Sequence, residues 1–239
     1  MIDFHYWPTP NGWKVAIMLE ECSLDYRMVP VDIHRGEQFR PEFLAISPNN
    51  RMPAIVDHDP DPAYGAEPVS VFESGAILLY LAEKTGRFLP TSAPGRKQAL
   101  EWLFWQVGNL GPMGGQLSHF VNYAEGEHDY SRRRYANEYN RCLGVLERRL
   151  ETREFLLGDY SVADMAAWPW VLGAKTLGQK LDEFPRVARW RQTMKERPAV
   201  RRSVDLGKSL RRNTPYSDEE RRILFEQTAA SVSGRDPGN

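Results

Sequence analysis

Apolar and polar side chains alternate along the first six residues, which predicts a strand with one buried face. The positions expected in the core are Ile2, Phe4 and Tyr6. Pro8 and Pro10 forbid continuation of the strand, and Asn11 is expected to cap a helix over residues 13–22. The apolar stripe of that helix, at Val15, Met18, Leu19 and Cys22, leaves Lys14 outside it.

Further strands are expected at 29–33, 54–56 and 69–72. Pro41 is expected to open a short helix over 41–46, and a longer helix follows the last strand until Gly86 ends it. The order β-α-β-α-β-β-α over residues 1–86 predicts a thioredoxin-like domain.

The rest of the chain has helical periodicity, so the predicted fold class is an α/β domain followed by an all-α domain. Residues 87–95 are expected to be a linker and residues 96–206 the helical domain. Helices are expected over 99–106, 131–152 and 184–198. A further helix is expected to start at a capping box of Ser161 and Asp164 and to kink at Pro169. Residues 207–239 form an extension in which Ser217 caps a helix to about Gln227, and the end from Ser231 is expected to be disordered.

Charge and composition exclude several classes of function. The chain carries 31 basic and 32 acidic side chains, so no basic field favours nucleic acid or an anionic membrane. It lacks an apolar run of eighteen residues and a signal-peptide pattern, and we expect a cytoplasmic protein. The two cysteines, Cys22 and Cys142, are far apart in sequence, which argues against a zinc site or a dithiol redox centre.

The corner between the first strand and the first helix is a candidate anion site. The helix start offers backbone N–H groups and a partial positive charge, and with the Thr9 hydroxyl and the Asn11 amide these would stabilise a thiolate. The same two residues are also explained as a strand end and a helix cap.

Polar groups that suit a small peptide occur at three more places. A cis bond before Pro53 would expose the backbone of Met52 to an extended ligand, although an ordinary edge-strand proline also fits. Ser74 at a helix start would bind a carboxylate while Glu73 accepts from an amino group, unless the pair only stabilises the first turn. Gln38 lies in a loop and would bind a second carboxylate, although an ordinary loop glutamine also fits.

Seven sequence motifs resemble the glutathione transferase superfamily, and within it the Nu-class branch, over residues 1–205. They are PTPNG (8–12), QFRPEF (38–43), SPNN (47–50), PAIVD (53–57), FESGAIL (72–78), WLFWQVG (102–108), and AD with WPW (163–164, 168–170).

The resemblance implies that glutathione is the co-substrate and that the protein is a homodimer. Its γ-glutamyl end would lie on Glu73 and Ser74, its cysteinyl backbone on Met52 before a cis Pro53, and its glycyl carboxylate near Gln38. Thr9 and Asn11 would face the sulfur, and Arg134 matches a family arginine that reaches the ligand. Tyr6 is the alternative sulfur ligand, but strand alternation places it in the core.

Because the corner offers no protein sulfur, the preferred function is a glutathione-dependent disulfide oxidoreductase in which glutathione supplies the redox thiol. One alternative is conjugation of glutathione to an electrophile or reduction of an organic hydroperoxide. The other is a non-catalytic glutathione-binding regulator that uses its helical domain to bind a protein.

Overall fold

The computed structural model describes residues 1–211 and 214–232, and the chain divides into two compact units. One unit comprises Met1–Lys84 together with Arg202–Asn239, and the other comprises Thr85–Arg201. The first unit is therefore built from both ends of the chain.

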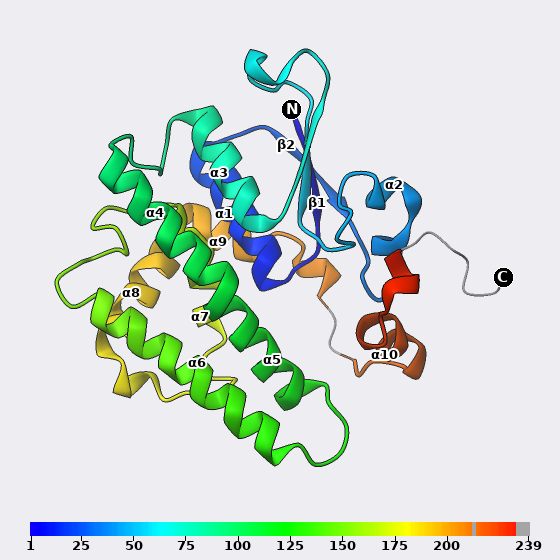
Figure 1. Ribbon diagram of the computed structural model, residues 1–239, viewed down its shortest axis with the longest axis vertical. Helices are drawn as coiled ribbons and strands as arrows, with labels where there is room; N and C mark the ends of the chain where they lie inside the picture. Colours follow the sequence, from blue (N-terminus) through cyan, green and yellow to red (C-terminus); the bar gives the residue numbers. More distant parts are fainter. Residues whose placement is uncertain (212–213, 233–239) are drawn as a thin grey trace. The chain divides into compact units, whose positions relative to one another are not determined.

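A four-stranded mixed sheet is the centre of the first unit. Its strands are β1 (Ile2–Tyr6), β2 (Tyr26–Pro30), β3 (Ala54–Asp57) and β4 (Val69–Phe72), in the order β2-β1-β3-β4. β1 pairs in parallel with β2, and the other pairings are antiparallel. With a helix after each of β1, β2 and β4, this is the predicted thioredoxin-like order, and β1 and β2 lie side by side in Figure 1.

The second strand lies three residues before its predicted place, so that prediction is wrong. The five residues of β2 match the five of β1, from Ile2 opposite Tyr26 to Tyr6 opposite Pro30. Val31 and Ile33, which suggested the later strand, instead belong to a loop. Val31 is part of an apolar cluster with Trp7 and Phe43, and Ile33 packs against that cluster.

Helix α1 (Pro10–Cys22) starts three residues earlier than predicted, and its N-cap is Thr9 instead of Asn11. The Thr9 hydroxyl accepts a hydrogen bond from the Gly12 backbone N–H at 3.3 Å. Pro10 fits the first helical position because the N–H that proline lacks has no partner there. Asn11 therefore stands in the first turn of the helix.

Gly12 is required where the chain turns from strand to helix. A Cβ atom at this position would lie 2.4 Å from the Trp7 carbonyl oxygen. The other helices of this segment are α2 (Pro41–Leu44) and α3 (Ser74–Thr85). α3 stops before Gly86, whose φ of 64° is left-handed, as predicted.

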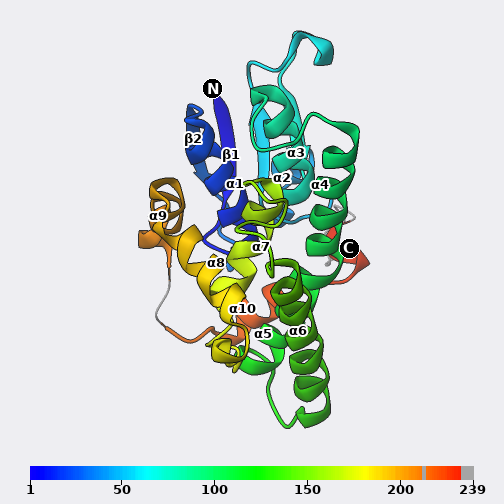
Figure 2. The same cartoon turned by 90° about the vertical axis from the view of Figure 1, so that its left-hand side faces the viewer.

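The second unit is helical, as predicted. Helix α4 (Ala93–Trp105) starts within the expected linker because Ser92 caps it, and it continues through a π-helical segment (Gln106–Leu110) into α5 (Gly111–Asn122). The predicted helix over 99–106 therefore does not end there but continues through the π-helical segment. Figures 1 and 2 show α6 (Asp129–Arg149) beside α5.

The buried carboxylate of Asp164 connects two helices of this unit. Asp164 forms the predicted capping box with Ser161 at the start of α7 (Val162–Leu172), and its carboxylate is fully buried. The oxygens accept four hydrogen bonds at 2.9–3.1 Å, from Leu156 N, Ser161 N, Ser161 Oγ and Trp190 Nε1. Trp190 belongs to α8 (Pro185–Glu196), so one carboxylate ties two helices together.

After α9 (Pro198–Asp205) the chain forms the C-terminal extension, residues 207–239. Its helix α10 (Asp218–Phe225) has the predicted cap, a capping box of Ser217 and Glu220. Ser231, the expected start of disorder, instead lies in a 3-10 turn (Ala229–Val232), and residues 233–239 of that prediction lie outside the described residues.

The extension packs on the N-terminal part of the same unit. Leu210 joins the apolar cluster of Trp7, Val31, Phe43, Met52 and Ala54, and the Tyr216 ring lies 5.1 Å from the His34 ring. In Figure 1 the last described residues, in red, lie beside α2. In the part of the chain that the structure describes, none of the helices combines the length and apolar character that crossing a bilayer requires.

Candidate functional site

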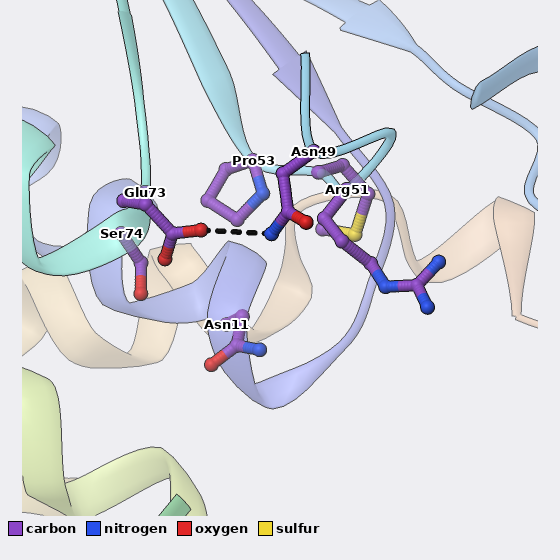
Figure 3. Close-up of a pocket in the computed structure, with 7 residues that line it drawn as sticks. Asn11, Asn49, Arg51, Pro53, Glu73 and Ser74 are labelled. Carbon is purple, nitrogen blue, oxygen red and sulfur yellow. Dashed lines mark hydrogen bonds between the residues drawn. The ribbon is translucent and has the colours of Figure 1, made fainter. Parts of the chain in front are cut away.

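A pocket of about 230 Å³ opens in the first unit. It is lined by Asn11, Asn49, Arg51, Met52, Pro53, Glu73 and Ser74. These residues come from three places, namely the first turn of α1, the turn before β3 and the start of α3 (Figure 3). The structure thus brings together five of the residues predicted from sequence: Asn11, Met52, Pro53, Glu73 and Ser74.

The start of α3 provides one end of the pocket. Glu73 has a left-handed φ of 68°, and its Oε1 accepts a hydrogen bond from Asn49 Nδ2 at 2.9 Å. Ser74 is the first helical residue, so its hydroxyl lies beside the backbone N–H groups of the first turn. This end of the pocket therefore carries a carboxylate acceptor next to an anion-binding helix terminus.

Lys14 lies beneath this end and was missed by the sequence analysis, which placed it outside the helix stripe. Its side chain is buried, with 2% of its surface exposed, and Nζ donates to Ser74 Oγ at 3.2 Å. Burial lowers the pKa of Lys14 to about 7, although the Glu73 carboxylate opposes that change. The spacing could have indicated this position, because Lys14 follows Asn11 by three residues and therefore lies on the same helix face.

We expect Lys14→Met to increase stability at pH 7 and to flatten its dependence on pH. Between the folded pKa of about 7 and the unfolded value of 10.5, the unfolded chain binds one more proton at Lys14. The free energy of unfolding of the wild type therefore gains a component that rises with pH over this window.

Urea unfolding of the wild type and the variant at several pH values measures this component. Lys97→Met, which changes an exposed lysine on α4, is the matched control and should leave the slope unchanged. An identical slope in wild type and Lys14→Met would contradict the expectation.

Thr9 is not among the lining residues of the pocket. Its Oγ1 donates to the Met52 sulfur at 3.6 Å, so the hydroxyl contacts a residue that does line the pocket. The Met52–Pro53 peptide bond is cis, as the sequence analysis proposed.

Arg51 and Asn49 are further lining residues that sequence reasoning missed. Both belong to the turn just before Met52 and Pro53, and this adjacency was the available signal. Arg51 Nη1 donates to Gln227 Oε1 at 2.6 Å, which connects the pocket to the C-terminal extension.

Gln38 and Arg134 are not among the lining residues. Gln38 is buried, and its Nε2 donates to the Ile33 carbonyl at 3.1 Å. Arg134 lies on α6 in the second unit and forms an ion pair with Glu138 at 2.7 Å. The ligand contacts assigned to these two residues stay predictions.

Tyr6 lies in the core, as strand alternation indicated. Its side chain is fully buried, its hydroxyl donates to the Leu206 carbonyl at 3.0 Å, and burial raises its pKa to about 12. In the described part of the chain, no group of three or more His, Cys, Asp or Glu side chains is arranged to hold a metal ion.

Comparison with known proteins places the chain in one family. Residues 1–83 match the glutathione S-transferase N-terminal domain, and residues 120–198 match the C-terminal domain. The chain is 53% identical to the disulfide-bond oxidoreductase YfcG of Escherichia coli K12 over 201 residues, which cover 84% of this chain and 93% of that protein. The chain therefore belongs to the glutathione S-transferase family.

Two solved structures are similar over most of their length. A glutathione transferase from Burkholderia graminis, with two glutathione molecules bound per subunit, has a TM-score of 0.80 and 43% identity, covering 85% of this chain and 87% of that one. One from Pseudomonas putida, with one glutathione disulfide per subunit, has a TM-score of 0.80 and 42% identity, covering 86% and 91%.

Proposed function

We propose that the protein is a glutathione-dependent disulfide-bond oxidoreductase in which bound glutathione supplies the redox sulfur. The observation that carries the proposal is a peptide-sized pocket with charged groups at both ends and neither Cys22 nor Cys142 in its wall. The 53% identity to a disulfide-bond oxidoreductase favours this chemistry over conjugation.

The charges of the pocket match those of glutathione. The ligand has an α-ammonium beside a carboxylate at one end and a second carboxylate at the other. Glu73 would accept from the ammonium, while Ser74 and the start of α3 would bind the adjacent carboxylate. Arg51 offers a positive charge for the second carboxylate.

Asn11 would stabilise the sulfur as a thiolate. It lines the pocket from the first turn of α1, where backbone N–H groups and the helix dipole favour a negative charge. Thr9 would act more indirectly, because its hydroxyl caps α1 and contacts Met52. Gln38 and Arg134 complete the set of residues proposed for the ligand.

The proposed reaction is two successive thiol–disulfide exchanges. In the first, the glutathione thiolate attacks one sulfur of the substrate disulfide, whose S–S bond breaks and releases a thiolate that takes up a proton. A second glutathione thiolate then attacks the mixed disulfide at the glutathione sulfur. The products are glutathione disulfide and two substrate thiols, so two glutathione molecules are oxidised for each disulfide reduced.

Turnover of bis(2-hydroxyethyl) disulfide with glutathione, with formation of glutathione disulfide as the readout, tests the proposal. Rates with an aryl halide and an organic hydroperoxide should be much lower. Faster conjugation of the halide would favour the transferase alternative. Glutathione binding without turnover of any substrate would favour the regulator.

Finer assignments belong to the same proposal. We propose a Nu-class homodimer in the cytoplasm, whose free thiols fit a reducing compartment. The proposed domains are 1–86, with a linker at 87–95, and 96–206, followed by the extension 207–239. Exposed apolar side chains such as Phe104, which is 66% exposed, support association with a second copy.

A further inference from the structure

The C-terminal extension reaches the pocket through the side chain of Gln227, two residues after α10. Gln227 Oε1 accepts from Arg51 Nη1 at 2.6 Å and from Asn50 Nδ2 at 3.3 Å. Gln227 Nε2 donates to the carbonyls of Ile223 and Leu224 at 2.9 and 3.2 Å. Both ends of this amide are therefore occupied, which fixes its orientation.

Arg51 carries a positive charge that no acidic side chain among the described residues neutralises. Within residues 1–211 and 214–232, no carboxylate forms an ion pair with its guanidinium. Gln227 is neutral, so it holds the guanidinium in place and leaves the charge intact. Figure 3 shows Arg51 on the opposite side of the pocket from Ser74.

We propose that Gln227 is a positioning residue, which holds Arg51 at the pocket so that it binds a free carboxylate at the far end of the ligand. The extension thereby makes the pocket selective for a thiol peptide that ends in a carboxylate over one that ends in an amide. This inference rests on the proposed function, because it concerns the glycyl end of glutathione.

The selectivity follows from the chemistry of the arginine. A carboxylate makes charge-assisted hydrogen bonds to a guanidinium, whereas a neutral amide offers one weaker acceptor and brings N–H groups toward a cation. An arginine held by a partner loses less side-chain freedom when the ligand binds. Gln227 therefore acts on the ligand through Arg51.

The extension has other anchors, so a change at Gln227 alone should leave it in place. Leu210 packs on the apolar cluster, Tyr216 lies on His34, and Ile223 lies next to Gly36. A point variant consequently tests the contact with Arg51 and keeps the helix that presents it.

The experiment compares the dissociation constants of glutathione and its glycine amide, measured by calorimetry with the full-length protein. In the wild type we expect the acid to bind about tenfold more tightly than the amide. In Arg51→Ala the two ligands should bind equally. In Gln227→Ala the preference should fall at least about threefold, since the arginine keeps its charge and loses its position.

Two further variants separate positioning from a general effect on folding. Gln227→Glu keeps an acceptor for Arg51 but neutralises its charge, so the preference for the acid should vanish while the amide still binds. Gln192→Ala removes an exposed glutamine that donates to Glu196 on α8, and it should retain the full preference. In the double variant of Arg51 and Gln227, the second change should add nothing to the first.

The outcomes distinguish this inference from the proposed function. If the wild type binds neither ligand, the proposed function fails together with the inference. If it binds both equally, or if Gln227→Ala and Gln227→Glu retain the full preference, the inference alone is overturned.

Discussion

Asn11→Ala is expected to lower kcat/KM for disulfide reduction at pH 7 by roughly 30-fold, the equivalent of about 2 kcal/mol. Asn11 lines the pocket in the first turn of α1, and its amide would donate to the thiolate. Without that donor the thiolate is less stable, so a smaller fraction of the bound thiol is ionised and ready to attack.

Two companion variants sharpen this result. Asn11→Asp keeps the shape and replaces the donor with a carboxylate, so repulsion of the thiolate should reduce the rate further. Thr9→Ala should affect activity less and instead cost about 1 kcal/mol of stability, because it removes the cap of α1. Thr9→Ser keeps the hydroxyl and is the matched control. Wild-type rates in Asn11→Ala would remove the role assigned to this residue.

The second large effect is expected on stability. Asp164→Ala should lower the free energy of unfolding by about 3 kcal/mol or more, because it leaves the four buried donors around this carboxylate without an acceptor. Burial raises the pKa of Asp164 to about 6, so the carboxylate is ionised at pH 7, where the measurement is made.

Thermal and urea unfolding of Asp164→Ala measure this loss. Asp159→Ala, which changes an exposed aspartate five residues earlier, should stay within about 0.5 kcal/mol of the wild type. Asp164→Asn retains one acceptor oxygen and should lie between the two. Equal stability of Asp164→Ala and the wild type would mean that water replaces the carboxylate.

Alternation of apolar and polar residues predicted β1, where Ile2, Phe4 and Tyr6 are buried as expected. The same rule failed at β2, because Val31 and Ile33 are apolar residues of a loop that packs near Trp7. A local apolar pattern indicates that residues are buried, but it does not indicate whether they form a strand or a loop.

The site was predictable where its residues sit at the start of a helix or strand, as Asn11, Met52, Pro53, Glu73 and Ser74 do. Lys14 was not, because periodicity assigns a lysine to the solvent face and cannot anticipate a buried hydrogen bond to Ser74. The contact between Arg51 and Gln227 joins residues 176 positions apart, and no local pattern encodes it.

Because the first unit contains both ends of the chain, it cannot be completed until synthesis on the ribosome is nearly finished. The Tyr6 hydroxyl can donate its hydrogen bond only after Leu206, whose carbonyl accepts it, has been synthesised 200 residues later. The sheet is translated first, yet its final partners emerge after every helix of the second unit. Such late, non-local contacts slow folding, and the pocket reaches its finished form only when the last segment arrives.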